Sequence, residues 1–262
     1  MNPLIKTARS ISPAGVIRMW YRNWKIFRKV FWFAAAPNFL EPVIYLTALG
    51  IGLGLLVRDI EGLSYVQFLA PGLLGSTVMY ASSFETTYSS FIRMKYEKTY
   101  DAVLATPLSI EDVIAGEILW GATRGYINAL TFLGVIAVFG YVDSAAALLL
   151  IPLLFVFAAL FAIVGMIYTA LVSNINLFNY YFTLFITPLF LFSGIFFPIS
   201  TLPAWAQKLA LFTPLYHVVL VCRGLTLGRL DQDVFTSIFI TVALTAVLFL
   251  IPIAIMRRRL IK

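Results

Sequence analysis

The sequence predicts an all-α integral membrane protein, and three observations lead to this fold class. Hydrophobic residues make up 61% of the 262 residues and charged residues only 12%, against roughly 25% charged in soluble domains. No Asp, Glu, Lys or Arg occurs in the 64 residues from Ser144 to Gln207, whereas one helical span needs about 20 apolar residues. Basic residues gather at the ends of the chain, with seven Lys and Arg in the first 30 residues and four in the last six.

This distribution of positive charge predicts that both termini lie in the cytoplasm, which requires an even number of spans. We therefore expect six transmembrane helices in a single domain over residues 1–262. The net charge of +7 does not indicate nucleic-acid binding, because the basic residues flank apolar runs instead of forming one continuous face.

Residues 13–31 are predicted to form an amphipathic helix that lies in the plane of the membrane surface. At about 100° per residue, Trp20 and Trp24 share one stripe of this helix, while Arg22 and Lys25 share another on the far side. Such a helix places its aromatic rings among lipid chains and its cations at anionic headgroups. It either anchors the chain only or also contacts a cytoplasmic partner, and the sequence leaves both readings open.

Six apolar runs follow this interfacial helix and are the expected spans. Their approximate ranges are 39–57, 65–91, 115–139, 145–172, 177–197 and 234–256. With cytoplasmic termini, the charged connection at 93–112 falls inside and the stretch 198–228 falls outside. That outer stretch is too apolar for a solvated loop and is broken by Pro198, Pro203 and Pro214, so we expect a re-entrant helical hairpin packed against the spans.

The sequence argues against chemistry within this chain. It contains no GxxxxGK[ST] pattern for a P-loop, no HExxH pattern, one histidine (His217) and one cysteine (Cys222). We therefore expect no catalytic residue, no metal and no cofactor here, and we expect that the chain is not itself an enzyme.

Four charged residues stand inside predicted spans: Glu41 and Glu117 near cytoplasmic ends, and, deeper, Glu85 in the second span and Arg124 in the third. A charge at the bilayer centre costs about 2.5 to 3.5 kcal/mol on insertion scales, so each is expected to face protein or a water-filled cavity. The depths of Glu85 and Arg124 are similar enough for pairing if the two helices touch. Two roles remain open, a salt bridge that locks the helices together and a place on a substrate path or gate.

Two patches of sequence resemble one family of membrane proteins. The connection RMKYEKTYDAVLATPLS, which begins at Arg93, and the outer segment FPISTLPAWAQ, which begins at Phe197, are similar to the ABC-2 family of exporter permeases. Within that family the likeness is greatest to the nodulation protein J group, which are permeases for lipo-oligosaccharide export. GLGLLVRDIEGLSYVQFLAPG and ASSFETTYSSFIRM carry this closer likeness, which extends over nearly the whole chain.

The resemblance implies a homodimer bound to two copies of a separate P-loop ATPase, which would hold ATP and Mg²⁺. A short helix in the 93–112 connection would sit in a cleft of that ATPase and turn its closure into a tilt of two spans. The residues expected to couple the two subunits are Tyr96, Glu97, Tyr100, Asp101, Leu104, Thr106, Pro107 and Leu108.

The implied cargo is an amphiphile with a glycan head, moved from the cytoplasmic side outward. Its candidate path comprises Glu85, Tyr88, Arg124, Asn176, Tyr180 and Tyr181, although the tyrosines and asparagines fit an interfacial aromatic belt equally well. Pro198, Pro203, Trp205 and His217 are the candidate outer gate. An ion-coupled secondary transporter and a membrane scaffold without transport remain as alternatives.

Overall fold

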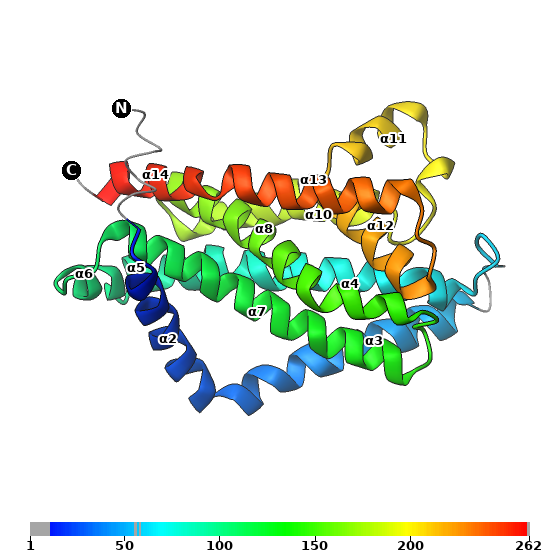
Figure 1. Ribbon diagram of the computed structural model, residues 1–262, viewed down its shortest axis with the longest axis horizontal. Coiled ribbons are helices and arrows are strands. Elements are labelled where there is room, and N and C mark those ends of the chain that lie inside the picture. The colour runs from blue at the N-terminus through cyan, green and yellow to red at the C-terminus, as the bar shows by residue number, and fades with distance from the viewer. Residues whose placement is uncertain (1–10, 55–56, 58, 261–262) are drawn as a thin grey trace.

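The computed structural model describes residues 11–54, 57 and 59–260, without the side chains of residues 32–39, 41–42, 51 and 53. The first predicted span therefore lies partly outside the described residues. The described chain is helical and contains no strand, only an isolated bridge between Ile60 and Leu63. Most of its helices run lengthwise in one bundle, and α2 begins at the same end of it as α14 finishes (Figure 1). We call this the terminal end and the opposite one the far end.

The first two described helices are α2 (Pro13–Lys29) and α3 (Phe31–Gly54). α2 corresponds to the predicted interfacial helix, and α3 covers the range of the predicted first span. Ser12 caps α2 and Pro13 occupies its first position, where a missing N–H costs nothing. The chain breaks at Val30, one residue before the predicted end of the interfacial helix. α3 therefore begins at Phe31, eight residues before the start predicted for the first span.

The second and third predicted spans are joined at the terminal end by a helical connection. α4 (Tyr65–Phe84) continues through a π-helical segment, η1 (Glu85–Ser89), into α5 (Ser90–Lys95). The short helix α6 (Thr99–Leu104) follows, and then α7 (Ile110–Val138). Ser64 and Ser109 form capping boxes that start α4 and α7, because each accepts from the backbone of a residue whose side chain accepts in return.

The rest of the chain supplies the other side of the bundle. A 3₁₀ segment η2 (Ala145–Leu149) leads into α8 (Leu150–Leu171), and η3 (Ile175–Leu177) into α9 (Phe178–Tyr180). A second π-helical segment, η4 (Tyr181–Ile186), precedes α10 (Thr187–Phe192). This helical run ends at Phe192, five residues before the end predicted for the fifth span. The outer stretch contains η5 (Ile199–Thr201), α11 (Ala204–Leu211) and α12 (Pro214–Leu227), and α13 (Gln232–Leu248) and α14 (Leu250–Leu260) complete the chain.

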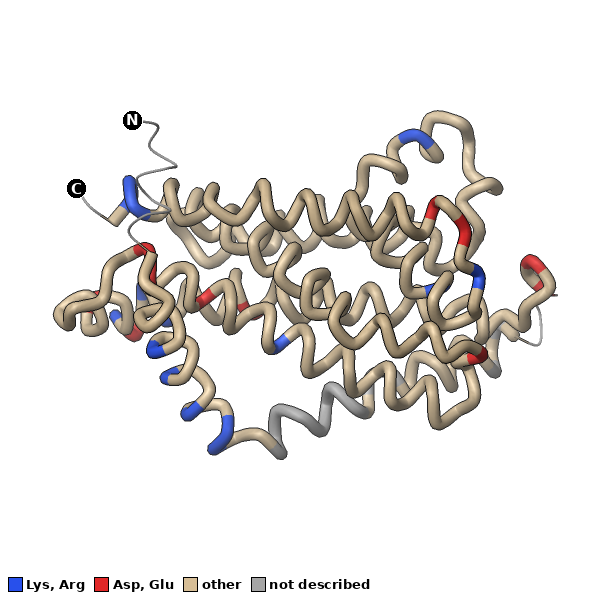
Figure 2. The backbone as a smooth tube through the Cα atoms, in the orientation of Figure 1, with Lys and Arg blue, Asp and Glu red and all other residues tan. Residues whose placement is uncertain are grey.

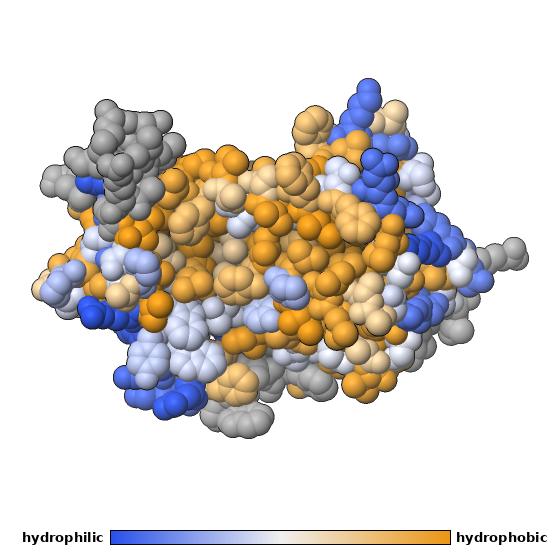
Figure 3. Space-filling model, in the orientation of Figure 1, coloured by the Kyte–Doolittle hydropathy of each residue, from blue (hydrophilic) through white to orange (hydrophobic). Residues whose placement is uncertain are grey.

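Three helical runs of the described chain are long and apolar enough to cross a membrane, namely Ala145–Leu171, Ile175–Phe192 and Gln232–Leu260. α11 and α12 meet at 84°, as in a broken span or a re-entrant loop. Hydrophobic residues cover the middle of the visible face and hydrophilic residues its two ends (Figure 3), and the charged residues gather at those ends as well (Figure 2). These features indicate a multi-pass membrane protein, while the count of six spans stays a prediction.

Close packing of α4, α7 and α8 depends on small residues. A Cβ atom at Gly121 on α7 or at Gly165 on α8 would overlap with Thr86 in η1. Because glycine has no side chain, the helix backbones come closer here than larger residues would allow. The three helices therefore hold η1 in a fixed position at the centre of the bundle.

Candidate functional site

A buried ion network links the helices near the terminal end. Arg93 on α5 donates from Nη1 to Glu85 Oε1 at 2.8 Å and from Nη2 to Glu117 Oε2 at 2.6 Å. The Glu117 side chain is completely buried, and that of Arg93 is 14% exposed. Trp120 Nε1 also donates to Glu85 Oε1, at 2.9 Å. One guanidinium thus pairs with two carboxylates from different helical segments, and such pairing is the condition for burying charges.

The π-helical segment brings Arg93 into line with Glu85. Eight residues of regular α-helix make about 2.2 turns, which would place the two side chains about 80° apart. A π-helical turn holds one more residue, so η1 lets eight residues complete close to two turns. The hydroxyl of Thr169 on α8 donates to the carbonyl of Thr86 within η1 at 2.7 Å. That bond satisfies a backbone oxygen at the irregular turn.

Arg124 lies beside this network, as the sequence predicted. Its Nε atom is 3.5 Å from Glu85 Oε2, so the expected pairing of the second and third spans is confirmed. Its guanidinium also stacks over the ring of Phe27 on α2, 4.3 Å from the centroid. Whether the pair only locks the helices or also serves a substrate path stays open.

The network continues into α2, which corrects one expectation. Asn23 donates to Glu117 at 2.8 Å, and Arg22 donates to Asn23 at 2.9 Å and to Thr99 at 3.3 Å. Arg22 was expected to point toward lipid headgroups, but it is half-buried against protein, and burial lowers its pKa. The reason is that α2 packs on α7 through the row Gly15, Met19, Asn23 and Phe27, which turns Arg22 inward.

The other three residues predicted for the interfacial helix lie around this contact. Trp20 donates to Thr123 on α7 at 2.9 Å and stacks on Trp24 with centroids 5.9 Å apart. Lys25 is exposed and lies over the ring of Tyr21. α2 therefore binds the bundle with one side and leaves cations on the other, and its place at a membrane surface stays a prediction.

The connection from α5 to α7 presents an exposed surface at the terminal end. Of the eight predicted coupling residues, five are exposed and two are partly buried; the exposed ones are Tyr96, Glu97, Asp101, Thr106 and Pro107, and the others are Leu104 and Leu108. Lys98 adopts a left-handed conformation with φ of 51°, which makes the sharp turn between α5 and α6.

Tyr100 was expected on the contact surface for the ATPase, but it lies in the interior. Its side chain is completely buried, and its hydroxyl lies 2.6 Å from that of Ser90 on α5. Burial raises the pKa of Tyr100 well above its usual range, so the phenol stays neutral. Tyr100 is therefore the anchor that holds α6 against α5, and it does not belong to the exposed contact surface.

A cavity of about 580 Å³ opens next to Glu85 and Arg124. It lies among α3, α4, α7 and the η4–α10 segment. Its polar lining includes Glu85, Arg124 and Asn128, and its aromatic walls include Phe84, Phe132, Phe182 and Phe190. The cavity thus combines charged groups with an apolar surface, which is the composition of a site for an amphiphilic molecule.

The other candidate path residues lie apart from this cavity. Tyr88 donates to Asn179 at 2.9 Å, and buried Tyr181 lies 3.2 Å from the hydroxyl of Ser83. Asn176 and Tyr180 are exposed and line a separate depression of about 610 Å³. The structure therefore brings together Glu85 and Arg124 but divides the remaining four residues between the interior and the surface.

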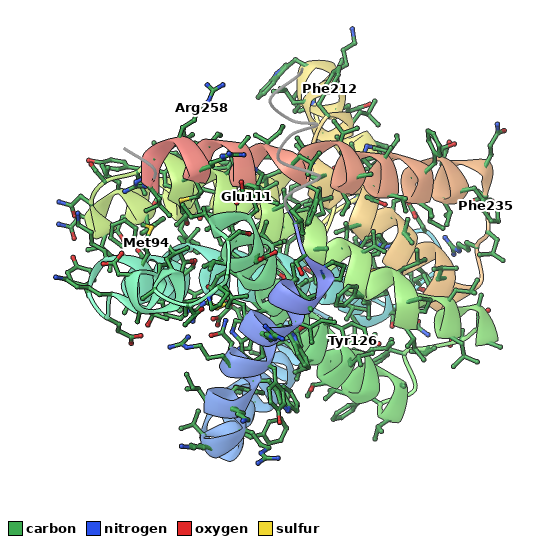
Figure 4. All side chains as sticks on the ribbon, turned by 60° about the vertical axis from the view of Figure 1, so that its left-hand side comes forward. Met94, Glu111, Tyr126, Phe212, Phe235 and Arg258 are labelled. Carbon is green, nitrogen blue, oxygen red and sulfur yellow. The ribbon has the colours of Figure 1, made fainter. Side chains whose placement is uncertain are left out.

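The residues of the candidate outer gate are also divided between the surface and the interior. Pro198 and Pro203 precede η5 and α11, and Trp205 on α11 is 64% exposed. α11 protrudes from the far end, and Phe212 at its end points away from the bundle (Figures 1 and 4). His217 on α12 is buried instead; its ring nitrogens lie 2.9 Å from the hydroxyl of Ser237 and from the carbonyl of Leu211. A gating role for these residues stays a prediction.

Sequence reasoning missed Arg93 and Glu117 as the centre of the network. A signal existed on α7, because Glu117, Trp120 and Arg124 are spaced by three and four residues and share one helix face. Arg93 carried no comparable signal, since its register depends on η1. In the described part of the chain, no three His, Cys, Asp or Glu side chains are grouped to hold a metal ion.

Comparison with known proteins adds a family match. The family model described as ABC-2 type transporter matches residues 15–227. Nodulation protein J of Rhizobium leguminosarum bv. viciae is 37% identical over 254 residues, which cover 95% of this chain and 98% of that protein. Nodulation protein J of Rhizobium meliloti (strain 1021) is also 37% identical, over 93% of each chain. The inner membrane transport permease YadH of Escherichia coli (strain K12) is 22% identical over 92% of this chain and 93% of that protein.

Proposed function

This chain belongs to the ABC-2 type transporter family and is a permease of an ABC transporter, and we propose that it exports an amphipathic or lipid-linked glycan. In this proposal two copies of the chain form the membrane path. Each copy binds one copy of a separate ATPase, which holds ATP and Mg²⁺. The chain contributes no catalytic residue of its own.

The observation that carries the proposal is the exposed connection between α5 and α7. It presents Tyr96, Glu97 and Asp101 at the terminal end, while buried Tyr100 fixes α6 to α5. Arg93 then ties α5 to Glu117 on α7. A partner that pushes on α6 would therefore move α5 and α7 together as one rigid body, which is how closure of an ATPase can tilt two spans.

Exposed polar residues on the fifth span support a paired arrangement. Tyr180, Thr183 and Thr187 are exposed and recur along one side of the helical run Ile175–Phe192, which is long and apolar enough to cross a membrane. Polar groups in lipid are costly and usually face protein or a water-filled cavity. We propose that this side faces the second copy of the chain across the path.

The glycan part of the proposal rests on the same residues. Hydroxyl, phenol and amide groups can donate and accept hydrogen bonds, as a sugar requires, and Asn176 and Tyr180 share one depression at the start of the span. The expected six spans and cytoplasmic termini would then place this depression at the inner surface of the bacterial inner membrane, where the cargo enters.

The test is purification of the tagged chain from its native membranes in mild detergent, with mass spectrometry of the chains that accompany it. We expect an equimolar P-loop ATPase. The variants Tyr96→Ala and Asp101→Arg, which change exposed residues of the connection, should lose that subunit. Asp231→Arg, an equally exposed acid at the far end, is the matched control and should keep it.

Two results would overturn this assignment. One is a chain that purifies without any ATPase under conditions that preserve other membrane complexes. The other is loss of the ATPase from the Asp231→Arg control to the same degree as from Asp101→Arg. The first result would favour an ion-coupled transporter or a scaffold.

A further inference from the structure

The cavity beside Glu85 and Arg124 has charged groups that are unequally satisfied. Glu85 accepts two hydrogen bonds at Oε1, from Arg93 and Trp120, and its Oε2 faces Arg124 Nε. Both carboxylate oxygens are therefore engaged. Arg124, by contrast, has only the 3.5 Å contact to Glu85 as an ion pair among the residues that the structure describes, and its buried Nη1 atom has no hydrogen-bond partner among them.

The charged cluster around Glu85 and Arg124 also contains more cations than anions. Three guanidinium groups (Arg22, Arg93 and Arg124) and two carboxylates (Glu85 and Glu117) form one connected cluster. Arg93 lies within 2.8 Å of both acids, but its single positive charge balances only one of their two negative charges. Arg22 and Arg124 supply two further positive charges, so the cluster carries one net positive charge, and Arg124 is the cation of the cluster that lines the cavity.

An unpaired donor on a buried cation costs free energy until an acceptor reaches it. A planar guanidinium suits phosphate, sulfate or carboxylate oxygens, since two N–H groups can donate to one anion. Beyond Arg124 the lining includes apolar Leu73, Phe132 and Phe190, beside the uncharged polar residues Ser76, Thr77 and Asn128. The volume of about 580 Å³ is in the range of sites for small amphiphiles.

We infer that this cavity binds the anionic head of an amphiphile at Arg124, with the first part of its apolar chain against the aromatic walls. The inference deepens the proposed function, on which it rests, because it assigns a negative charge to the cargo head. Among the described residues that line the cavity, Arg124 is the single cation. Selectivity for anionic over neutral heads should therefore depend on this one side chain.

The experiment measures binding to the purified chain, with its accompanying subunits, in phosphatidylcholine nanodiscs. The probes are radiolabelled dodecyl phosphate and dodecyl maltoside, which share the chain but differ in head charge. We expect dodecyl phosphate to bind at least about tenfold more tightly, which is a difference of about 1.4 kcal/mol. Equal affinities would overturn the inference.

Substitutions of Arg124 test whether this side chain is the source of the anion preference. Arg124→Gln should weaken dodecyl phosphate by about tenfold and leave dodecyl maltoside within about twofold, so that the maltoside probe also reports an intact cavity. Arg124→Lys should keep most of the anion preference. Arg229→Gln, an exposed arginine at the far end, is the matched control and should change neither probe. An anion preference that survives Arg124→Gln would refute the assignment.

If Arg124→Gln fails to fold, Glu85→Gln/Arg124→Gln replaces it, because that double variant removes one charge of each sign and leaves Arg93 paired with Glu117. Competition then distinguishes the sources of the anion. Inorganic phosphate that displaces the probe at similar concentrations would overturn an amphiphile site. Displacement of the probe by phosphatidylglycerol in the nanodisc would identify a bilayer lipid as the occupant. A probe that phosphatidylglycerol does not displace would favour the cargo as the occupant.

Failure of this inference and failure of the proposed function are distinguishable. An ATPase that co-purifies with a chain showing no anion preference leaves the exporter assignment in place and removes the inference. An Arg124-dependent anion preference in a chain without an ATPase removes the exporter assignment and leaves the binding site.

Discussion

Replacement of Arg93 by Gln is the perturbation that the structure predicts most sharply. Arg93 pairs with Glu85 at 2.8 Å and with Glu117 at 2.6 Å. Removing one partner of a buried ion pair typically costs about 3 to 5 kcal/mol, because a charge is left without compensation. For a chain of this size that loss corresponds to a fall in Tm of roughly 6 to 20 °C.

The two carboxylates should not suffer equally. Without Arg93, Glu85 keeps the Trp120 hydrogen bond and the contact with the Arg124 cation at 3.5 Å, whereas Glu117 keeps the uncharged donors of Asn23 and Tyr100. In the Arg93→Gln background, Glu117→Gln should therefore restore more stability than Glu85→Gln. Both double variants remove one charge of each sign, so a difference between them reports local pairing and not overall charge.

The assay is thermal unfolding of the detergent-solubilised chain, followed by tryptophan fluorescence. Arg229→Gln is the matched control, because its pair with Glu61 is exposed and 3.8 Å long, and such pairs contribute about 0 to 1 kcal/mol. The reasoning is refuted if Arg93→Gln costs no more than this control. It is also refuted if Glu85→Gln rescues Arg93→Gln better than Glu117→Gln does.

Two further predictions concern packing and can use the same unfolding assay. Gly165→Ala should destabilise the chain by about 1 to 3 kcal/mol, because the new methyl group meets Thr86. Gly134→Ala, on a helix with open space around it, should be neutral or stabilising by up to about 1 kcal/mol; equal effects at both positions would contradict this account. Tyr100→Ala should cost about 3 to 5 kcal/mol through loss of a buried ring, whereas Tyr100→Phe should cost only the hydrogen bonds of the hydroxyl with Ser90 and Glu117, about 1 to 3 kcal/mol. If Tyr100→Ala left Tm unchanged, Tyr100 would not be the anchor of α6.

Local features of the sequence were enough to predict much of the architecture. Apolar runs and prolines indicated the helices, because these signals act within one or two turns. The expected ranges agree with the structure within five residues for α7 and for the continuous run of η2 and α8, and in the structure Ser109 caps α7 and Ser144 caps η2. The pairing of Glu85 with Arg124 was also predictable, since two charges at similar depth in apolar helices seek each other.

Other features were decided only by the tertiary structure. Tyr100 and Arg22 carry the sequence signals of surface residues, yet both turn inward because of the helices that pack beside them. Arg93 reaches Glu85 only because η1 adds a residue to one helical turn, and close packing on Gly165 holds η1 in place. Sequence patterns report which face of a helix is apolar, but contacts between faces depend on how the helices meet in space. By itself, therefore, the sequence determined the class of protein and most of its helices, while the packing determined which charged groups are satisfied and which one faces the cavity.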